Sequence, residues 1–113
     1  MQILTNEISV LELKKIANHL FGNLVKAVVD VEKQIIVIDA ELHADEEALL
    51  LKNGSKQENL WGINLYPDLF RDDFIEFDSM INLRPSVGNM SRGIDDEKIK
   101  KKITHIVYKF IKK

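Results

Sequence analysis

The first hydrophobic pattern in the chain repeats every three or four residues between Ser9 and Gly22. Such a repeat places its apolar members on one face of a helix. These members are Leu13, Ile16, Ala17, Leu20 and Phe21. Ser9 and Glu12 have the spacing of a capping box, in which each side chain satisfies a free backbone N–H group at the helix start. The pattern predicts a helix that begins near Val10 and ends before Gly22, because glycine tolerates the left-handed backbone of a helix C-terminus.

The pattern changes to alternation of apolar and polar residues from Leu24 onward, which is the period of a β-strand. Val28 interrupts the polar side of this run. A second run, rich in β-branched residues, covers 35–42, and the connection 32–34 is short enough for a hairpin. A short edge strand is also predicted over residues 2–5.

A second alternating region begins at residue 60 and predicts another hairpin. Residues 60–66 alternate with Trp61 on the apolar side, and residues 74–84 form the longest alternation in the chain. Pro85 ends this last run because proline cannot donate a hydrogen bond to a strand ladder. The charged residues 68–73 are interpreted as a connection.

Two further helices are predicted from residue preferences. Asp45 and its acidic neighbours suit a helix start, and the Ala and Leu residues that follow favour a helix over 45–52. Asn53-Gly54 leaves open a strand that turns there, since this dipeptide is typical of hairpins. A last helix begins near Asp95. Its buried stripe contains Ile99, Ile103, Ile106, Val107 and Phe110, and its lysine-rich side is interpreted as a solvated face.

These elements follow the order helix, two strands, helix, two strands, helix. We therefore expect an α+β fold, in a single domain over residues 1–113, whose antiparallel sheet is covered by helices on one face. The other face of the sheet is then open to water or to a partner.

Composition narrows the class of protein. The chain has 113 residues, of which 45% are hydrophobic, so it can form one apolar core. It has no cysteine, which excludes disulfides and thiolate sites, and no apolar run approaches the ~20 residues of a membrane span. We expect a cytoplasmic protein. A net charge of −2 argues against general DNA binding, so a nucleic-acid role needs a local patch.

Polar residues of the four main strands would gather on the open face of such a sheet. Asn64 and Tyr66 are candidate ligand-binding residues there. Carboxylates are poor strand residues and repel each other when clustered, so an acidic group on this face suggests a hard cation such as Mg²⁺ or Mn²⁺. The candidate metal ligands are Asp39, Glu41, His43, Glu76 and Asp78. The alternative is the ordinary charged, solvated face of an antiparallel sheet.

The loop RPSVGNMSRG, residues 84–93, is the second candidate site. Its donors Arg84, Asn89, Ser91 and Arg92 precede a helix start, and together these features are typical of a site for phosphate or another anion. The alternative is a structural clamp, in which the arginines bind carbonyl groups of the protein itself.

Three segments resemble an uncharacterised prokaryotic family of about this length, known only as a domain of unknown function. They are FGNLVKAVVDVEK, ELHADEEALLLKNGSKQENLWGINLYP and FIEFDSMINLRPSVGNMSRGI, and the resemblance extends from about Phe21 to the end of the chain. It implies a single small domain and brings no activity or catalytic residues with it.

Two functions are therefore weighed. The first is a binding or interaction module that uses the polar sheet face and the 84–93 loop, with a protein, a second copy of the chain or a phosphate-bearing ligand as partner. Phe74 and Met80, which the alternation places on the open face, suggest the homodimer. The alternative is a divalent-metal-dependent enzyme that acts on a phosphate ester such as RNA or a nucleotide.

Overall fold

The computed structural model describes all residues from 1 to 113. Its α-helices are α1 (Val10–His19), α2 (His43–Lys52) and α3 (Glu97–Phe110). Five strands form an antiparallel sheet in the spatial order β1-β4-β3-β5-β6, namely β1 (Gln2–Leu4), β3 (Val25–Asp30), β4 (Ile35–Ile38), β5 (Leu60–Leu65) and β6 (Ile75–Glu76). Short 3₁₀ turns occur at η1 (Gln57–Asn59), η2 (Arg71–Asp73), η3 (Met80–Asn82) and η4 (Pro85–Val87). The predicted α+β class and antiparallel sheet are confirmed.

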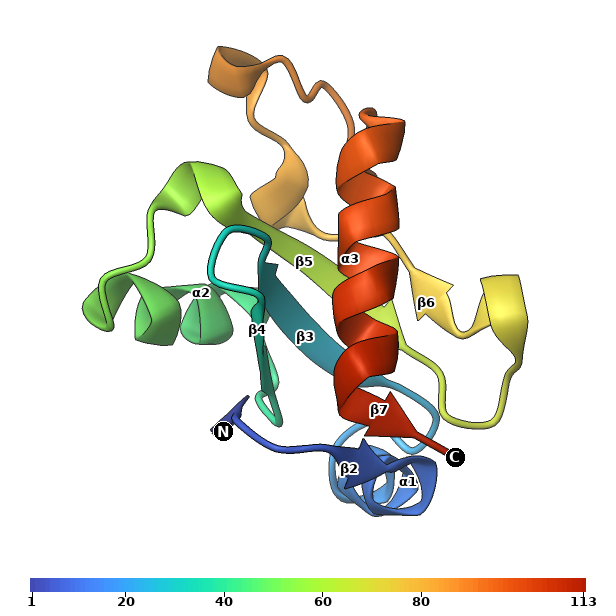
Figure 1. Ribbon diagram of the computed structural model, residues 1–113. Coiled ribbons are helices and arrows are strands. Elements are labelled where there is room, and N and C mark those ends of the chain that lie inside the picture. The colour runs from blue at the N-terminus through green and yellow to red at the C-terminus, as the bar shows by residue number, and fades with distance from the viewer.

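A small parallel pair joins the two ends of the chain. Strand β2 (Ile8–Ser9) lies beside β7 (Ile111–Lys112), so the start of α1 is tied to the end of α3 (Figure 1). The sequence predicted neither strand. None of the helices combines the length and the apolar composition that crossing a membrane requires.

Helix α1 confirms the Ser9 half of the predicted capping box and the predicted glycine after the helix end. The Ser9 hydroxyl accepts a hydrogen bond from the backbone N–H of Glu12 at 3.1 Å. The helix ends at His19, and the N–H of Gly22 donates to the Ala17 carbonyl at 2.6 Å. Gly22 has a φ of +88°, so the glycine supplies the left-handed backbone expected after the helix.

Both predicted hairpins form, with shorter second strands. Strand β3 pairs with β4, and β5 pairs with β6. Strand β4 stops at Ile38 rather than at Leu42, because Asp39 has a φ of +71° and a strand cannot continue through that conformation. The helix predicted over 45–52 is confirmed as α2, and the last helix begins after its N-cap Asp96.

The long strand predicted over residues 74–84 is wrong for most of its length, because β6 has only two residues. Ser79 instead caps a 3₁₀ turn by accepting the N–H of Ile81 at 3.3 Å. Asn82 then pairs with β5 through its side chain, accepting the N–H of Gly62 at 2.8 Å and donating to its carbonyl at 2.9 Å. A side-chain amide thus takes the place of backbone pairing.

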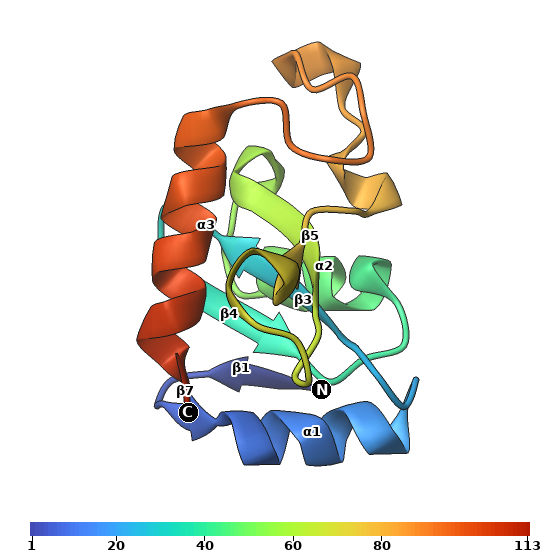
Figure 2. The same cartoon turned by 90° about the vertical axis from the view of Figure 1, so that its right-hand side faces the viewer.

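Helices cover both faces of the sheet, whereas the sequence predicted one covered face. Figure 2 shows α3 and α2 on opposite sides of the strands. Helices α1 and α3 form the main core with one face, and on the other face Leu50 of α2 packs against Val28 and Val37. These two valines lie on the face that was expected to be polar, and burying them favours a covering helix.

Candidate functional site

Part of the predicted polar face is present near the β6 edge of the sheet. Asn64 of β5 lies between Lys26 of β3 and Glu76 of β6. The Asn64 amide and the Tyr66 hydroxyl both donate to one carboxylate oxygen of Glu76, at 2.8 and 3.1 Å. Desolvation and this hydrogen bond raise the pKa of Tyr66. The structure therefore brings Asn64, Tyr66 and Glu76 together, with their polar groups bonded to one another.

Helix α2 places two buried titratable groups over this side of the sheet. The Nε2 of His43 lies 2.8 Å from the carbonyl oxygen of Ile63, to which it donates, and burial lowers the pKa of His43. Glu46 is fully buried, and neither carboxylate oxygen has a hydrogen-bond partner. Burial raises the pKa of Glu46 to about 10. Both side chains are therefore uncharged at neutral pH.

The side chains predicted as metal ligands do not converge. Those residues are Asp39, Glu41, His43, Glu76 and Asp78. Asp39 lies 3.7 Å from the N-terminal ammonium group, and Asp78 accepts a hydrogen bond from Arg92 at 2.7 Å. Glu41 is exposed beyond the end of β4. No group of three or more histidine, aspartate or glutamate side chains is placed to hold a metal ion.

Arg84 acts on the protein itself. Its Nε donates to the Ile81 carbonyl at 2.9 Å, and its two terminal nitrogens donate to the carbonyls of Gln57, at 2.8 Å, and of Leu60. The guanidinium group also lies over the ring of Trp61, 4.9 Å from the centroid. This is the geometry of the structural clamp, the alternative that the sequence left open.

Asn89 organises the rest of the 84–93 loop. Its side-chain nitrogen lies 2.7 Å from the carbonyl oxygen of Asn82 and 2.9 Å from that of Gly93. Its side-chain oxygen accepts the backbone N–H of Asp95 at 2.8 Å. Because Asn89 is almost fully buried, these bonds fix the loop from inside. In Figure 1 the loop forms the orange lobe that projects beyond one end of α3.

The anion at this loop is a carboxylate of the chain. Asp95 accepts hydrogen bonds from the Ser91 hydroxyl at 2.8 Å and from the Met90 N–H at 2.9 Å, and these bonds lower the pKa of Asp95. Arg92 pairs with Asp78. Of the donors predicted for an external anion, Ser91 and Arg92 therefore hold carboxylates of the chain, whereas Arg84 and Asn89 donate to its carbonyl groups.

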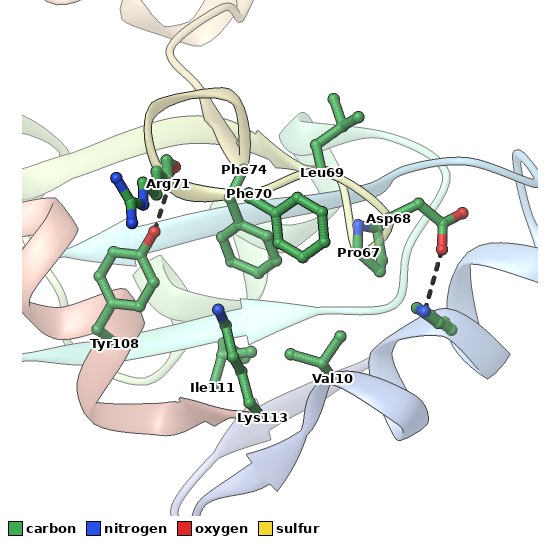
Figure 3. Close-up of a pocket in the computed structure, with 11 residues that line it drawn as sticks. Val10, Pro67, Asp68, Leu69, Phe70, Arg71, Phe74, Tyr108, Ile111 and Lys113 are labelled. Carbon is green, nitrogen blue, oxygen red and sulfur yellow. Dashed lines mark hydrogen bonds and ion pairs between the residues drawn. The ribbon is translucent and has the colours of Figure 1, made fainter.

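A pocket lies at the opposite end of α3 and has a volume of about 460 Å³. It is formed by the start of α1, the connection between β5 and β6, and the C-terminal residues (Figure 3). We call it the Phe70 pocket. Its apolar lining comes from Val10, Pro67, Leu69, Phe70, Phe74 and Ile111.

The polar groups of the Phe70 pocket are mainly cationic. Lys14 pairs with Asp68 at 3.2 Å, and the ammonium group of Lys113 lies 5.5 Å from the centre of the Phe70 ring. Arg71 is exposed and pairs with no carboxylate within ion-pair distance. An apolar floor with an excess of positive charge therefore characterises the pocket.

Ring stacking and one hydrogen bond form a wall of the pocket. The rings of Phe74 and Tyr108 stack with their centres 5.9 Å apart, and the Tyr108 hydroxyl donates to the Arg71 carbonyl at 3.3 Å (Figure 3). Arg71 has a φ of +50°, an uncommon conformation for a residue with a side chain. Such backbone strain occurs often at ligand-binding positions.

Sequence reasoning missed this pocket and treated residues 68–73 as a charged connection. The only signal was the pair Leu69 and Phe70, two large apolar residues within a polar segment. Phe70 is 71% exposed, whereas Phe74, which was predicted to lie on an open face, is buried.

Comparison with known proteins gives a family without an assigned activity. No curated protein and no solved structure matches the chain. The model of one family matches residues 2–110, nearly the whole chain, and its description is "Protein of unknown function (DUF5674)". The resemblance inferred from the sequence is thereby confirmed, and the chain belongs to this family of proteins of unknown function.

Proposed function

We propose that this protein is a small ligand-binding module whose binding site is the Phe70 pocket. The ligand carries a compact apolar or aromatic group together with a negative charge. The observation that carries the proposal is the pocket itself, which combines an apolar lining with Lys14, Arg71 and Lys113.

The dimensions and the chemistry of the pocket suit such a ligand. Small-molecule sites usually measure about 300–1,000 Å³ and combine a mainly apolar lining with a few polar groups. The volume of about 460 Å³ lies in this range. An aromatic group can pack on Phe70 and Ile111, and Arg71 has free donors for a carboxylate, sulfonate or phosphate.

The proposal keeps the binding role expected from the sequence. It places the binding site in the Phe70 pocket instead of on the polar sheet face and the 84–93 loop. The donors of Arg84, Asn89 and Ser91 are engaged within the chain, so the 84–93 loop has little left for a ligand. The alternative of a metal-dependent enzyme on a phosphate ester gains no support, because no three candidate ligands meet.

Titration with the fluorescent probe 8-anilinonaphthalene-1-sulfonate tests the proposal, because this probe joins aromatic rings to a sulfonate. We expect saturable binding to the folded protein, at least tenfold weaker binding in Phe70→Ala, and a several-fold loss in Arg71→Ala. Phe70 is largely exposed, so its removal leaves the fold intact.

Leu83→Ala is the matched control, since Leu83 is an exposed apolar residue that directly precedes the 84–93 loop and does not line the pocket. Its affinity for the probe should equal that of the wild type. Equal affinity of Phe70→Ala and the wild type would overturn the proposal. Equally tight binding of an uncharged aromatic probe would refute the requirement for a negative charge.

A further inference from the structure

The Phe70 pocket is the end of a longer groove. A second hollow of about 730 Å³ lies between α3 and the η2–β6 segment, and it shares Arg71 and Tyr108 with the pocket. A third hollow of about 490 Å³ lies over the same part of α3 and adjoins the second, with which it shares Phe77, Glu97, Lys100, Thr104 and Tyr108.

The groove contains two pairs of a cation and an aromatic ring. Lys113 lies over Phe70 at 5.5 Å, and Lys100 lies over Phe77 at 5.6 Å from the ring centre. Tyr108, 40% exposed, stands between these two pairs and lines all three hollows.

Three cations of the groove have no carboxylate partner within ion-pair distance, namely Arg71, Lys101 and Lys113, whereas Lys14 and Lys100 are paired with Asp68 and Glu97. The acidic residues that line the groove are Asp72 and the two paired carboxylates, Asp68 and Glu97. The protein as a whole has a net charge of −2, so this positive excess is local.

We infer that the groove binds single-stranded nucleic acid, with one base in the Phe70 pocket and the following backbone along α3. This inference rests on the proposed function of the pocket. Proteins that bind single strands combine a positive groove with aromatic side chains on which bases stack, and Phe70 and Tyr108 offer exposed rings. The cations beside them are placed to contact phosphates.

The exposed rings favour a single strand over other polyanions. A duplex has its bases stacked internally and is held mainly through phosphates, so it does not use Phe70. An acidic peptide supplies charge without flat rings for the pocket. The local character of the positive patch also agrees with the argument from net charge against general DNA binding.

Fluorescence anisotropy with a labelled oligothymidylate of about 12 nucleotides, within the range of known single-strand sites, tests the inference. The three unpaired cations should neutralise about three phosphates. Each such contact on a single strand contributes about 0.7 to the salt dependence, so a plot of log Kd against log salt concentration should rise with a slope of about 2. Lys101→Ala should reduce that slope by about 0.7. Phe70→Ala should weaken binding at least tenfold without changing the slope.

Lys52→Ala is the matched control, because Lys52 is an exposed lysine on α2, on the other side of the sheet. Its affinity and salt slope should equal those of the wild type. Equal binding of a duplex or of poly-glutamate would overturn the inference, and so would an unchanged slope in Lys101→Ala.

The two proposals can fail separately. If the wild type binds the sulfonate probe in the Phe70 pocket but not the oligonucleotide, the inference is refuted and the proposed function stands. If Phe70→Ala changes binding of neither ligand, both are refuted.

Discussion

Arg84 shows how one residue holds several segments of this protein together. Its guanidinium group bonds carbonyls in η1, at the start of β5 and in η3, which are joined by no continuous strand. The side chain is only 10% exposed; its bonds to Ile81 and Leu60 are partly buried, and its bond to Gln57 is exposed. The sequence marked Arg84 as a candidate site residue. An arginine before a proline is compatible both with binding an anion and with clamping the protein's own carbonyl groups, so the sequence left both roles open.

Replacement of Arg84 tests the clamp. Arg84→Ala should lower the free energy of unfolding by about 2 kcal/mol, because it leaves the partly buried carbonyls of Ile81 and Leu60 without this donor. Arg84→Lys should recover only part of this loss, since an ammonium group cannot reproduce a planar fork of donors. Arg92→Ala, which removes an exposed ion pair, should cost less than about 1 kcal/mol. Urea denaturation of the three variants measures the effects, and equal losses at the two arginines would rule out the clamp.

Glu46 makes stability depend on pH. The unfolded side chain ionises above its ordinary pKa of 4.5, whereas the folded one remains protonated up to about pH 10. Between these two pH values the folded state binds one proton more than the unfolded state. The contribution of Glu46 to the free energy of unfolding therefore falls as pH rises from 4.5 toward 10, by at most about 1.4 kcal/mol per pH unit.

The variant Glu46→Gln cannot ionise and should lose this dependence. Its free energy of unfolding, measured by urea denaturation between pH 5 and pH 8, should rise relative to the wild type at each step in pH. Parallel pH profiles of the two proteins would show that Glu46 ionises normally in the folded state. The measurement is independent of whether the amide itself fits well, because only the slope is compared.

Secondary-structure elements with a clear local cause were predictable from the sequence. Helix α1 has the spacing of a capping box and an N-cap serine, and α3 has an unbroken apolar stripe, so both were found close to their observed bounds. The second hairpin shows the limit of such patterns. Residues 77–84 alternate like a strand, yet Ser79 and Asn82 satisfy backbone groups with their side chains, and alternation carries no information about that.

Gly62 permits the close approach of η3 to β5. A Cβ atom at this position would lie 2.6 Å from the Cβ of Ser79, nearer than two carbon atoms can pack. Gly62→Ala should therefore destabilise the protein by about 1–3 kcal/mol. Ser79→Gly should restore part of this loss in the double variant, because it removes the atoms in conflict. Thermal denaturation of the single and double variants tests this, and strictly additive effects would refute the proposed contact.

At the scale of the whole molecule, the sequence predicted the α+β class but not the arrangement around the sheet. Val28 was the residue that already disagreed with an open polar face, and α2 covers it. The Phe70 pocket could not be predicted from local sequence patterns, for a different reason. Its lining comes from Val10 and Lys14, from 67–74 and from 108–113, segments that only the tertiary fold brings together.

The most direct test of the pocket as the binding site is a map of backbone amide shifts by ¹⁵N NMR during titration with 8-anilinonaphthalene-1-sulfonate. The pocket predicts that the largest shifts fall in residues 10–14, 67–74 and 108–113 and that the 84–93 loop stays unchanged. Shifts centred on Asn64, Glu76 and the 84–93 loop, with none around Phe70, would contradict binding in the Phe70 pocket and would place the binding site on the polar face of the sheet.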